Sequence, residues 1–389
     1  MEPPTTEIIY FDNAATSWPK PEATWPAMEQ YLRSIGGSPG RSGHRLSVAA
    51  GRIVFDTREG LAELFGVRDS SRIIFTKNAT EALNLAICGL LGPDDHVITS
   101  GMEHNSVMRP LQALVDQGLA LSVVPSAANG ELDPRELTKN IRKKTKAIFL
   151  IHASNVTGGI MPIAEVGKIA RENGLIFCVD AAQTAGAVPI DVEMMHIDLL
   201  AFTGHKSLFG PPGTGGLYIR EGLESAIQPI MRGGTGSRSE SEYQPDFLPD
   251  KYESGTPNTV GLAGLGAGVR FVLAETVEAI RAREHQLTTL FLEGIAEIPG
   301  VKMYGPERGA PRIPVVSFVM DGKDPAQLAL SLDEQFGIMS RPGLHCAPQA
   351  HRTIGTYPAG CVRFSFGYFN TEDQLLKALR ALAHLSSMR

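Results

Sequence analysis

Short runs of β-branched and aromatic residues alternate with helical patterns along the first half of the chain. The early strand runs are Ile73–Thr76, His96–Thr99 and Leu121–Val124, and helical patterns begin near Ala79, Ser106 and Pro134. This alternation is typical of a mostly parallel sheet, because parallel strands need a crossover that is usually a helix. We therefore expect an α/β fold whose functional side chains gather at the carboxyl ends of the strands.

The same pattern continues far enough to complete a seven-stranded sheet flanked by helices. The later strand runs are Ala147–Ile151, Leu175–Val179, Asp198–Phe202 and Gly216–Ile219. Residues 232–251 are polar and rich in Gly, Pro and Ser, which predicts a mobile functional loop. A helical stretch over 260–287 leads to further strand runs and an amphipathic last helix. We expect a large domain of residues 21–258 and a smaller α+β domain of residues 1–20 and 259–389.

Composition narrows the class of protein further. A chain of 389 residues exceeds the size at which single cores stop growing, and 43% hydrophobic with 20% charged residues is ordinary for a globular protein. The net charge of -6 gives no general basic surface, so we expect no nucleic-acid partner. No run approaches the roughly 20 apolar residues of a membrane span. Small-molecule chemistry is the better expectation.

The N-terminus and the cysteines predict a cytoplasmic protein without disulfide bonds. Residues 1–7 contain no basic run followed by an apolar stretch, so they do not resemble a secretory leader. The cysteines are Cys88, Cys178, Cys346 and Cys361, and no two of them form a CxxC pair. We expect neither a disulfide framework nor a metal site.

The strand run at 198–202 leads directly into Thr203, Gly204, His205 and Lys206. An amine at the carboxyl end of a strand can form a Schiff base with an aldehyde cofactor, while neighbouring hydroxyl and imidazole groups bind its phosphate. An isolated lysine in a loop would more often be a solvated surface residue. Lys206 becomes the candidate for the Schiff base because other candidate cofactor-binding residues occur at the ends of neighbouring strands.

Asp180 and Gln183 follow the strand run that ends at Val179. A carboxylate here can keep the pyridine nitrogen of pyridoxal phosphate protonated, so that the ring absorbs electrons from a carbanion. Asp180 also suits a helix N-cap. Gln183, three residues later, fits either a capping box or a hydrogen bond to the ring oxygen of the cofactor.

Two further strand ends carry candidate residues. Asn78 is predicted to cap a helix, with Glu81 completing a capping box, so that Ala79 and Thr80 lie at a helix N-terminus suited to phosphate. His104 follows the next strand, where an imidazole can stack on a cofactor ring and assist proton transfer. Each signal is weak alone, since ordinary caps and structural histidines look the same.

In combination these motifs resemble a known family. The chain contains, in this order, Asp12–Thr16, Asn78–Glu81, Glu103–Asn105, His152–Gly158, Val179–Gln183, Thr203–Lys206, Gly255–Asn258 and Arg341–Ala347. It resembles class V aminotransferase-fold enzymes, and within them the group II (SufS-like) cysteine desulfurase and selenocysteine lyase family. The resemblance covers essentially the whole chain. It implies the fold of type I pyridoxal-phosphate transferases and pyridoxal 5'-phosphate as cofactor.

The resemblance also implies roles for individual cofactor-binding residues. Lys206 would carry the cofactor and act as catalytic base, and His104 would stack on the ring. Asp180 would pair with the ring nitrogen, and Gln183 would bond to the ring oxygen. The phosphate would be bound by Ala79, Thr80, Thr203 and His205. Asn155 would lie beside the cofactor and the substrate. Thr256 would reach the phosphate held by a partner subunit, which implies a homodimer.

The implied chemistry depends on Cys346. Arg341–Ala347 resembles the short loop of group II enzymes, whose cysteine thiolate takes sulfur from L-cysteine as a persulfide and leaves L-alanine. Arg363 would bind the substrate carboxylate, with Arg341 beside it. An acceptor protein or thiol must then remove the sulfur, as in iron–sulfur cluster assembly. Cys88 and Cys178 are expected to be buried and inert, and Cys361 has no assigned role.

Three alternatives remain open. The same fold can act as a selenocysteine lyase or related β-lyase, as a true aminotransferase, or as a non-catalytic partner in sulfur-cofactor assembly. The chain also departs from the family, since Asn78-Ala79 replaces the Gly-Thr of many relatives and removes one phosphate-binding hydroxyl. We expect weaker cofactor binding. Gly210–Gly216 lacks the Gly-Lys-Ser/Thr ending of a nucleotide loop and precedes a strand, so we expect no nucleotide there.

Overall fold

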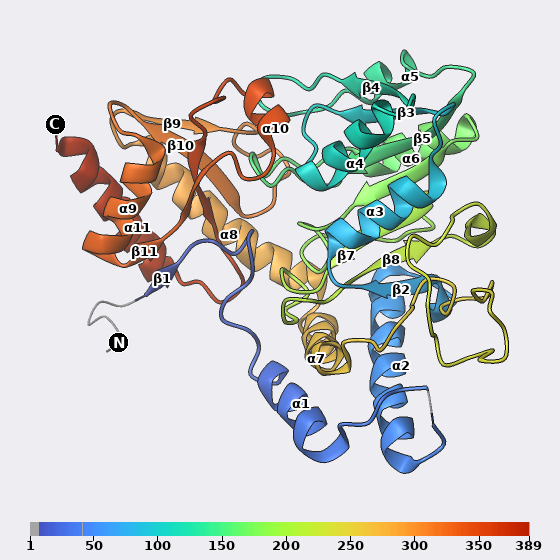
Figure 1. The fold of residues 1–389 in the computed structure, drawn as a ribbon. Helices are drawn as coiled ribbons and strands as arrows, with labels where there is room; N and C mark the ends of the chain where they lie inside the picture. Colours follow the sequence, from blue (N-terminus) through green and yellow to red (C-terminus); the bar gives the residue numbers. More distant parts are fainter. Residues whose placement is uncertain (1–7, 41, 389) are drawn as a thin grey trace.

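A computed structural model describes residues 8–40 and 42–388 (Figure 1). Residues 1–7, on which the expectation about a leader depends, lie outside the described part. Within the described part, no single helix is long and apolar enough to cross a bilayer, and two helices meet the length and composition criteria only as a pair bent by 82°.

The large sheet has seven strands in the order β2-β8-β7-β6-β5-β3-β4. Their bounds are β2 Ile73–Thr76, β3 His96–Ser100, β4 Ala120–Val124, β5 Thr145–Ile151, β6 Ile176–Asp180, β7 Leu199–Thr203 and β8 Gly215–Ile219. Strands β3 to β7 pair in parallel, whereas β8 is antiparallel to both β2 and β7. The predicted seven-stranded, mostly parallel sheet is confirmed.

Helices cover both faces of this sheet, as Figure 1 shows. The helices of this part are α1 Thr24–Gln30, α2 Arg45–Phe65, α3 Ala79–Leu90, α4 Asn105–Val115, α5 Pro134–Thr138 and α6 Ile163–Glu172, with a π-helical turn at Tyr31–Ile35 and 3-10 turns at Ser70–Arg72 and Leu223–Ser225. Successive residues of a strand point to opposite faces. Leu200 and Phe202 of β7 therefore join one apolar core, while Leu199 and Ala201 join the other.

The smaller domain contains an antiparallel sheet of order β12-β13-β10-β9. Its elements are α8 Val277–Ala296, β9 Val301–Tyr304, β10 Val315–Met320, α9 Pro325–Phe336, β11 Ile338–Met339, β12 Arg341–Gly343, α10 Pro348–Thr353, β13 Cys361–Ser365 and α11 Glu372–Ser387. Near the N-terminus, β1 Ile9–Tyr10 pairs in parallel with β11. Phe11 packs edge-on against Phe366 at 5.0 Å between ring centroids, so this early segment belongs to the core of the smaller domain.

The helical stretch expected over 260–287 is two helices rather than one. Helix α7 spans Thr259–Glu275, and the next residue, Thr276, has a φ of 69° that turns the chain before α8 begins. Leu262 of α7 packs in the core of the large domain, and Leu287 of α8 packs in the core of the smaller one. The boundary at 258/259 stays a prediction, and this packing leads us to propose that the domains divide at the bend.

The segment between Ser225 and α7 contains no helix or strand among the described residues. The irregular structure predicted for residues 232–251 is thus confirmed, whereas its mobility stays a prediction. The Gly-rich stretch 210–216 leads into β8, as expected for a turn between strands.

Candidate active site

A cavity lies at the carboxyl ends of the parallel strands. It is lined by Asn78, Ala79, Thr80, His104, Ser106, Ile151, Asn155, Asp180, Ala182, Gln183, Thr203, His205 and Lys206. Every predicted cofactor-binding residue except Thr256 is in this set. The strand-end rule therefore brings together side chains that are far apart in the sequence.

Lys206 lies just beyond the end of β7, in the wall of the cavity. Burial lowers the pKa of its amine to about 8, the nearby Arg363 adds to the effect, and the Asp180 carboxylate partly opposes it. Its amine makes no hydrogen bond or ion pair to any residue that the structure describes. Lys206 is thus an accessible nucleophile that loses its proton far more easily than an ordinary lysine.

Asp180 is the last residue of β6 and is buried. Its Oδ1 accepts a hydrogen bond of 2.9 Å from the Ala182 amide, and burial raises its pKa. Residues 181–187 form turns rather than a helix, so the alternative roles of Asp180 and Gln183 in a helix cap are wrong. Gln183 instead donates to the Ala14 carbonyl at 3.1 Å, which fixes its side chain in the cavity wall.

Helix α3 begins at the cavity, as predicted from its cap. Asn78 Oδ1 accepts from the Glu81 amide at 2.9 Å, which confirms Asn78 as the N-cap. Glu81 Oε2 accepts from the Lys77 amide at 2.6 Å, one residue earlier than the reciprocal bond of the predicted capping box. The free amides at the start of α3 make this wall suited to an anion.

Ser106 is a cavity residue that the sequence analysis missed. Its hydroxyl lies 2.8 Å from Thr80 Oγ1 and 2.9 Å from His104 Nδ1, and its amide donates to the same Nδ1 at 3.1 Å. Because Nδ1 accepts, the ring proton of neutral His104 is on Nε2. Burial and Lys206 lower the pKa of His104 to about 4, so the ring is uncharged. The sequence signal that could have identified Ser106 is its position two residues after a histidine at the start of a helix.

Three polar atoms in the cavity wall have no partner in the described structure. They are Asn155 Oδ1, Thr203 Oγ1 and His205 Nδ1, all buried. Buried polar atoms are normally hydrogen-bonded, so three orphans on one cavity indicate a place built for a polar ligand. A phosphate-bearing pyridine ring fits this set, because Thr203 and the start of α3 offer donors and Asp180 offers an acceptor for a protonated ring nitrogen.

Arg363 and Arg341 lie opposite each other on β13 and β12. Arg363 is buried and donates to Asp12 Oδ1 at 2.7 Å and to the Asn155 carbonyl at 3.1 Å. Its Nε has no partner among the described residues. Arg363 is therefore a buried arginine in an ion pair, and Asp12 is a second residue whose contact the sequence did not predict.

Cys346 is exposed and lies beside the cavity rather than in its wall. Arg341 Nη2 is 3.5 Å from its sulfur. Asn155 Nδ2 donates to the His345 carbonyl at 2.7 Å, and the Asn105 amide donates to the Cys346 carbonyl at 2.8 Å. The loop is therefore tied to the cavity wall through Asn155 and to the start of α4 through Asn105.

The other cysteines differ in burial. Cys178 is buried, as expected, whereas Cys88 is exposed, so its expected burial is wrong. Cys88 lies on α3 within an apolar run, and the helix turns this position outward. Cys361 is buried, and burial raises the pKa of its thiol to about 11.

Thr256 is exposed and lines a different, larger cavity beside Phe55 and Ile230. The structure does not bring it to Lys206 within one chain. Its predicted contact with a cofactor phosphate therefore requires a second subunit.

The parallel sheet, the lysine at its carboxyl edge and the second domain define an enzyme with an aminotransferase-type fold. The family model described as aminotransferase class-V matches residues 9–377. The chain belongs to that family.

The names of similar proteins specify a reaction within this family. A probable cysteine desulfurase of Pyrococcus abyssi is 36% identical over 390 residues, covering 98% of this chain and 95% of the relative. A probable cysteine desulfurase of Methanothermobacter thermautotrophicus is 32% identical over 384 residues, with 98% and 95% covered. The apo structure of a cysteine desulfurase from Thermococcus onnurineus has a TM-score of 0.92 at 36% identity, with 97% of this chain and 94% of that chain covered.

Proposed function

We propose that this chain is a pyridoxal-phosphate-dependent cysteine desulfurase that converts L-cysteine to L-alanine and receives the sulfur on Cys346. The observation that carries the proposal is the pairing of two nucleophiles. Lys206 is a buried amine with a lowered pKa inside the cavity, and Cys346 is an exposed thiol held at its edge. The names of the relatives support the same reaction.

The cavity wall accounts for cofactor binding. The amides at Asn78–Thr80, the Thr203 hydroxyl and His205 would hold the phosphate, and Asp180 would hold the ring nitrogen. When bound, pyridoxal phosphate supplies an aldehyde that condenses with amines and a ring that absorbs the electrons of a broken Cα–H bond. The Ser106 hydroxyl fixes His104 through Nδ1, so that the neutral ring would contact the cofactor from the cavity wall.

Lys206 and Arg363 prepare the substrate. The neutral amine of Lys206 takes the proton from the substrate Cα, which its lowered pKa makes possible near neutral pH. The free Nε of Arg363 donates to the substrate carboxylate. Asp12 holds the guanidinium in place, since it occupies Nη2 at 2.7 Å.

Cys346 completes the reaction. Its sulfur forms a bond to the substrate sulfur while the Cβ–S bond breaks, and the electron pair of that bond stays with the carbon skeleton, which is protonated to alanine. Cys346 keeps the sulfur as a persulfide until an acceptor protein or thiol removes it. Arg341 Nη2 lies 3.5 Å from the Cys346 sulfur and so helps to hold it at the edge of the cavity.

We infer the finer assignments from the same residues. The short loop between Arg341 and Cys346 supports the group II branch of the family, and the exposed Thr256 supports a homodimer that shares its sites. We further propose that the enzyme works in the cytoplasm and passes sulfur to a protein of iron–sulfur cluster assembly.

A competition assay tests the function against its alternatives. The holoenzyme is given L-cysteine, L-selenocysteine or an amino acid with a keto-acid acceptor, and alanine, sulfide and selenide are measured. We expect alanine and sulfide from cysteine, accelerated by a thiol acceptor, and little amino transfer. Selenide release with no turnover of cysteine would instead assign a selenocysteine lyase.

A further inference from the structure

The loop that presents Cys346 has an unusual backbone. His345 and Cys346 have φ values of 50° and 57°, a conformation that side-chain-bearing residues rarely adopt. Two such residues in succession persist only where surrounding contacts determine the backbone. Here Asn155 Nδ2 and the Asn105 amide donate to the carbonyls of His345 and Cys346, and the buried His345 side chain makes two further hydrogen bonds.

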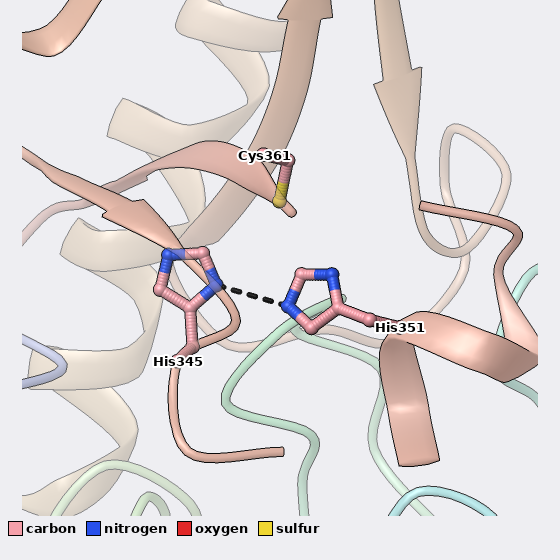
Figure 2. Close-up of side chains that lie close together, drawn as sticks. All are labelled: His345, His351 and Cys361. Carbon is pink, nitrogen blue, oxygen red and sulfur yellow. Dashed lines mark hydrogen bonds between the residues drawn. The ribbon is translucent and has the colours of Figure 1, made fainter. Parts of the chain in front are cut away.

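A buried chain of hydrogen bonds runs behind the thiol, through residues that the reaction does not use. Thr356 Oγ1 lies 2.7 Å from His351 Nδ1, His351 Nε2 lies 3.2 Å from His345 Nδ1, and His345 Nε2 lies 2.9 Å from the Arg341 carbonyl. Figure 2 shows the two imidazoles facing each other across the central bond. The rings are buried and nearly parallel, with an interplanar angle of 26°.

One assignment of protons satisfies every bond in this chain. Thr356 donates to His351 Nδ1, His351 donates from Nε2 to His345 Nδ1, and His345 donates from Nε2 to the Arg341 carbonyl. Both imidazoles are then neutral. Burial supports this, because it lowers the pKa of His351 to about 4 and that of His345 to about 2.

We propose that His345 and His351 are positioning residues for Cys346, acting through the backbone of residues 341–346. His345 fixes the carbonyl of Arg341, whose guanidinium contacts the Cys346 sulfur at 3.5 Å. His351 fixes the ring of His345 through the hydrogen bond between the two imidazoles. The inference deepens the proposed function, since it assigns residues that hold the sulfur-receiving thiol in place.

Cys361 offers a competing explanation for the same cluster. Its sulfur and one nitrogen of each imidazole all lie within 4.8 Å of one another, and Figure 2 shows the sulfur beside the two rings. Two imidazoles and a thiol are ligands for a soft or borderline metal ion. The complete hydrogen-bond chain and the protonated Cys361 thiol favour the positioning role, and metal content distinguishes the two.

The test compares His351→Leu with His351→Gln, whose amide can replace the bond made by Nε2. His96→Leu is the matched control, because His96 is also buried and bonded to two hydroxyls, those of Thr145 and Ser122, at the opposite ends of the strands. Hydrogen exchange of the peptide spanning 341–347 and alkylation of Cys346, resolved by peptide mass, report on the loop without any sulfur chemistry. Borohydride fixation at Lys206 reports on the cofactor site.

We expect His351→Leu to accelerate exchange in residues 341–347, change Cys346 alkylation and lower kcat by about 10- to 100-fold, as a misplaced reacting group does. KM and fixation at Lys206 should change much less. His351→Gln should recover most of the loss, and His96→Leu should leave kcat and this peptide unchanged.

Several results would overturn the proposal. The first is a His351→Leu variant whose hydrogen exchange, Cys346 alkylation and kcat equal those of the wild type. The second is a His351→Gln variant whose kcat is no higher than that of His351→Leu. A stoichiometric transition metal in the wild type, lost in both His351→Leu and Cys361→Ser, would establish a metal site instead. Should His351→Leu not fold, Thr356→Val removes the far end of the same chain and is measured in its place. Because exchange and alkylation need no substrate, they remain decisive even if the protein proves not to be a desulfurase.

Discussion

Lys206 shows how burial prepares a single residue for chemistry. Its amine lies in a cavity with two arginines and a buried aspartate nearby, and the balance lowers its pKa to about 8. The cost of burying a charge thus makes the amine reactive. At the same pH, the neutral fraction of an exposed lysine would be on the order of a hundredfold smaller.

The pH dependence of cofactor loading follows from this value. Only the neutral amine condenses with an aldehyde, so the rate at which apoenzyme binds pyridoxal phosphate covalently should rise about tenfold per pH unit below the pKa. The rise should level off above about pH 8, the folded-state pKa of Lys206. Absorbance measured by stopped flow between pH 6 and 9.5 gives the profile. A rate still rising steeply at pH 9.5 would mean that Lys206 has the pKa of an exposed lysine.

At the scale of elements, the ends of strands and helices carry the site. Asp180 ends β6, Thr203 ends β7, and Asn78 begins the first turn of α3. Because a strand end and a helix cap are local features, sequence patterns predicted most of the sheet and most of the cavity wall.

What the sequence did not reveal depends on contacts between distant residues. The pair of Asp12 with Arg363 joins residues 351 positions apart, and Gln183 bonds Ala14 across 169 positions. Such pairs form only when segments that are distant in the sequence pack together, and no local pattern encodes them. The prediction that Cys88 is buried was wrong for a related reason, because an apolar run does not show which face of α3 is covered.

The contribution of the α3 N-cap to cofactor binding can be tested by comparing it with the N-cap of α11. Asn78→Ala removes the bond to the Glu81 amide at the cavity and should cost about 0.5–2 kcal/mol of stability. Thr371→Ala removes the corresponding bond of α11 and should cost a similar amount. Only Asn78→Ala should weaken retention of pyridoxal phosphate in dialysis. Equal retention in the two variants would show that the start of α3 does not hold the cofactor.

At the scale of the molecule, the site needs both domains. Asp180 ends β6 and Lys206 follows β7 in the large domain. Arg341 and Arg363 lie on β12 and β13 in the smaller domain, and Cys346 follows β12. Asn155 joins them, because it lines the cavity and donates to the His345 carbonyl at 2.7 Å. Relative movement of the domains would therefore separate the amine from the thiol.

The predicted homodimer extends this argument to a second chain. Thr256 lies outside the cavity of its own chain, so its proposed contact is with the phosphate in the other. Thr256→Ala should lower pyridoxal-phosphate affinity several-fold while the protein stays dimeric by sedimentation. Thr235→Ala, in the same irregular segment, serves as control. A fully active wild-type monomer would contradict the shared site.

The central claim is that Cys346 receives the sulfur. The most direct measurement is the mass of each cysteine-containing peptide after holoenzyme meets L-cysteine without an acceptor. The account predicts one additional sulfur on the Cys346 peptide, removable by reductant, and none on the peptide of Cys88, the other exposed cysteine. Cys346→Ala should keep its cofactor but lose both this mass and most alanine production, while Cys88→Ala should lose neither. The added sulfur on Cys361, or wild-type alanine production by Cys346→Ala, would contradict the account.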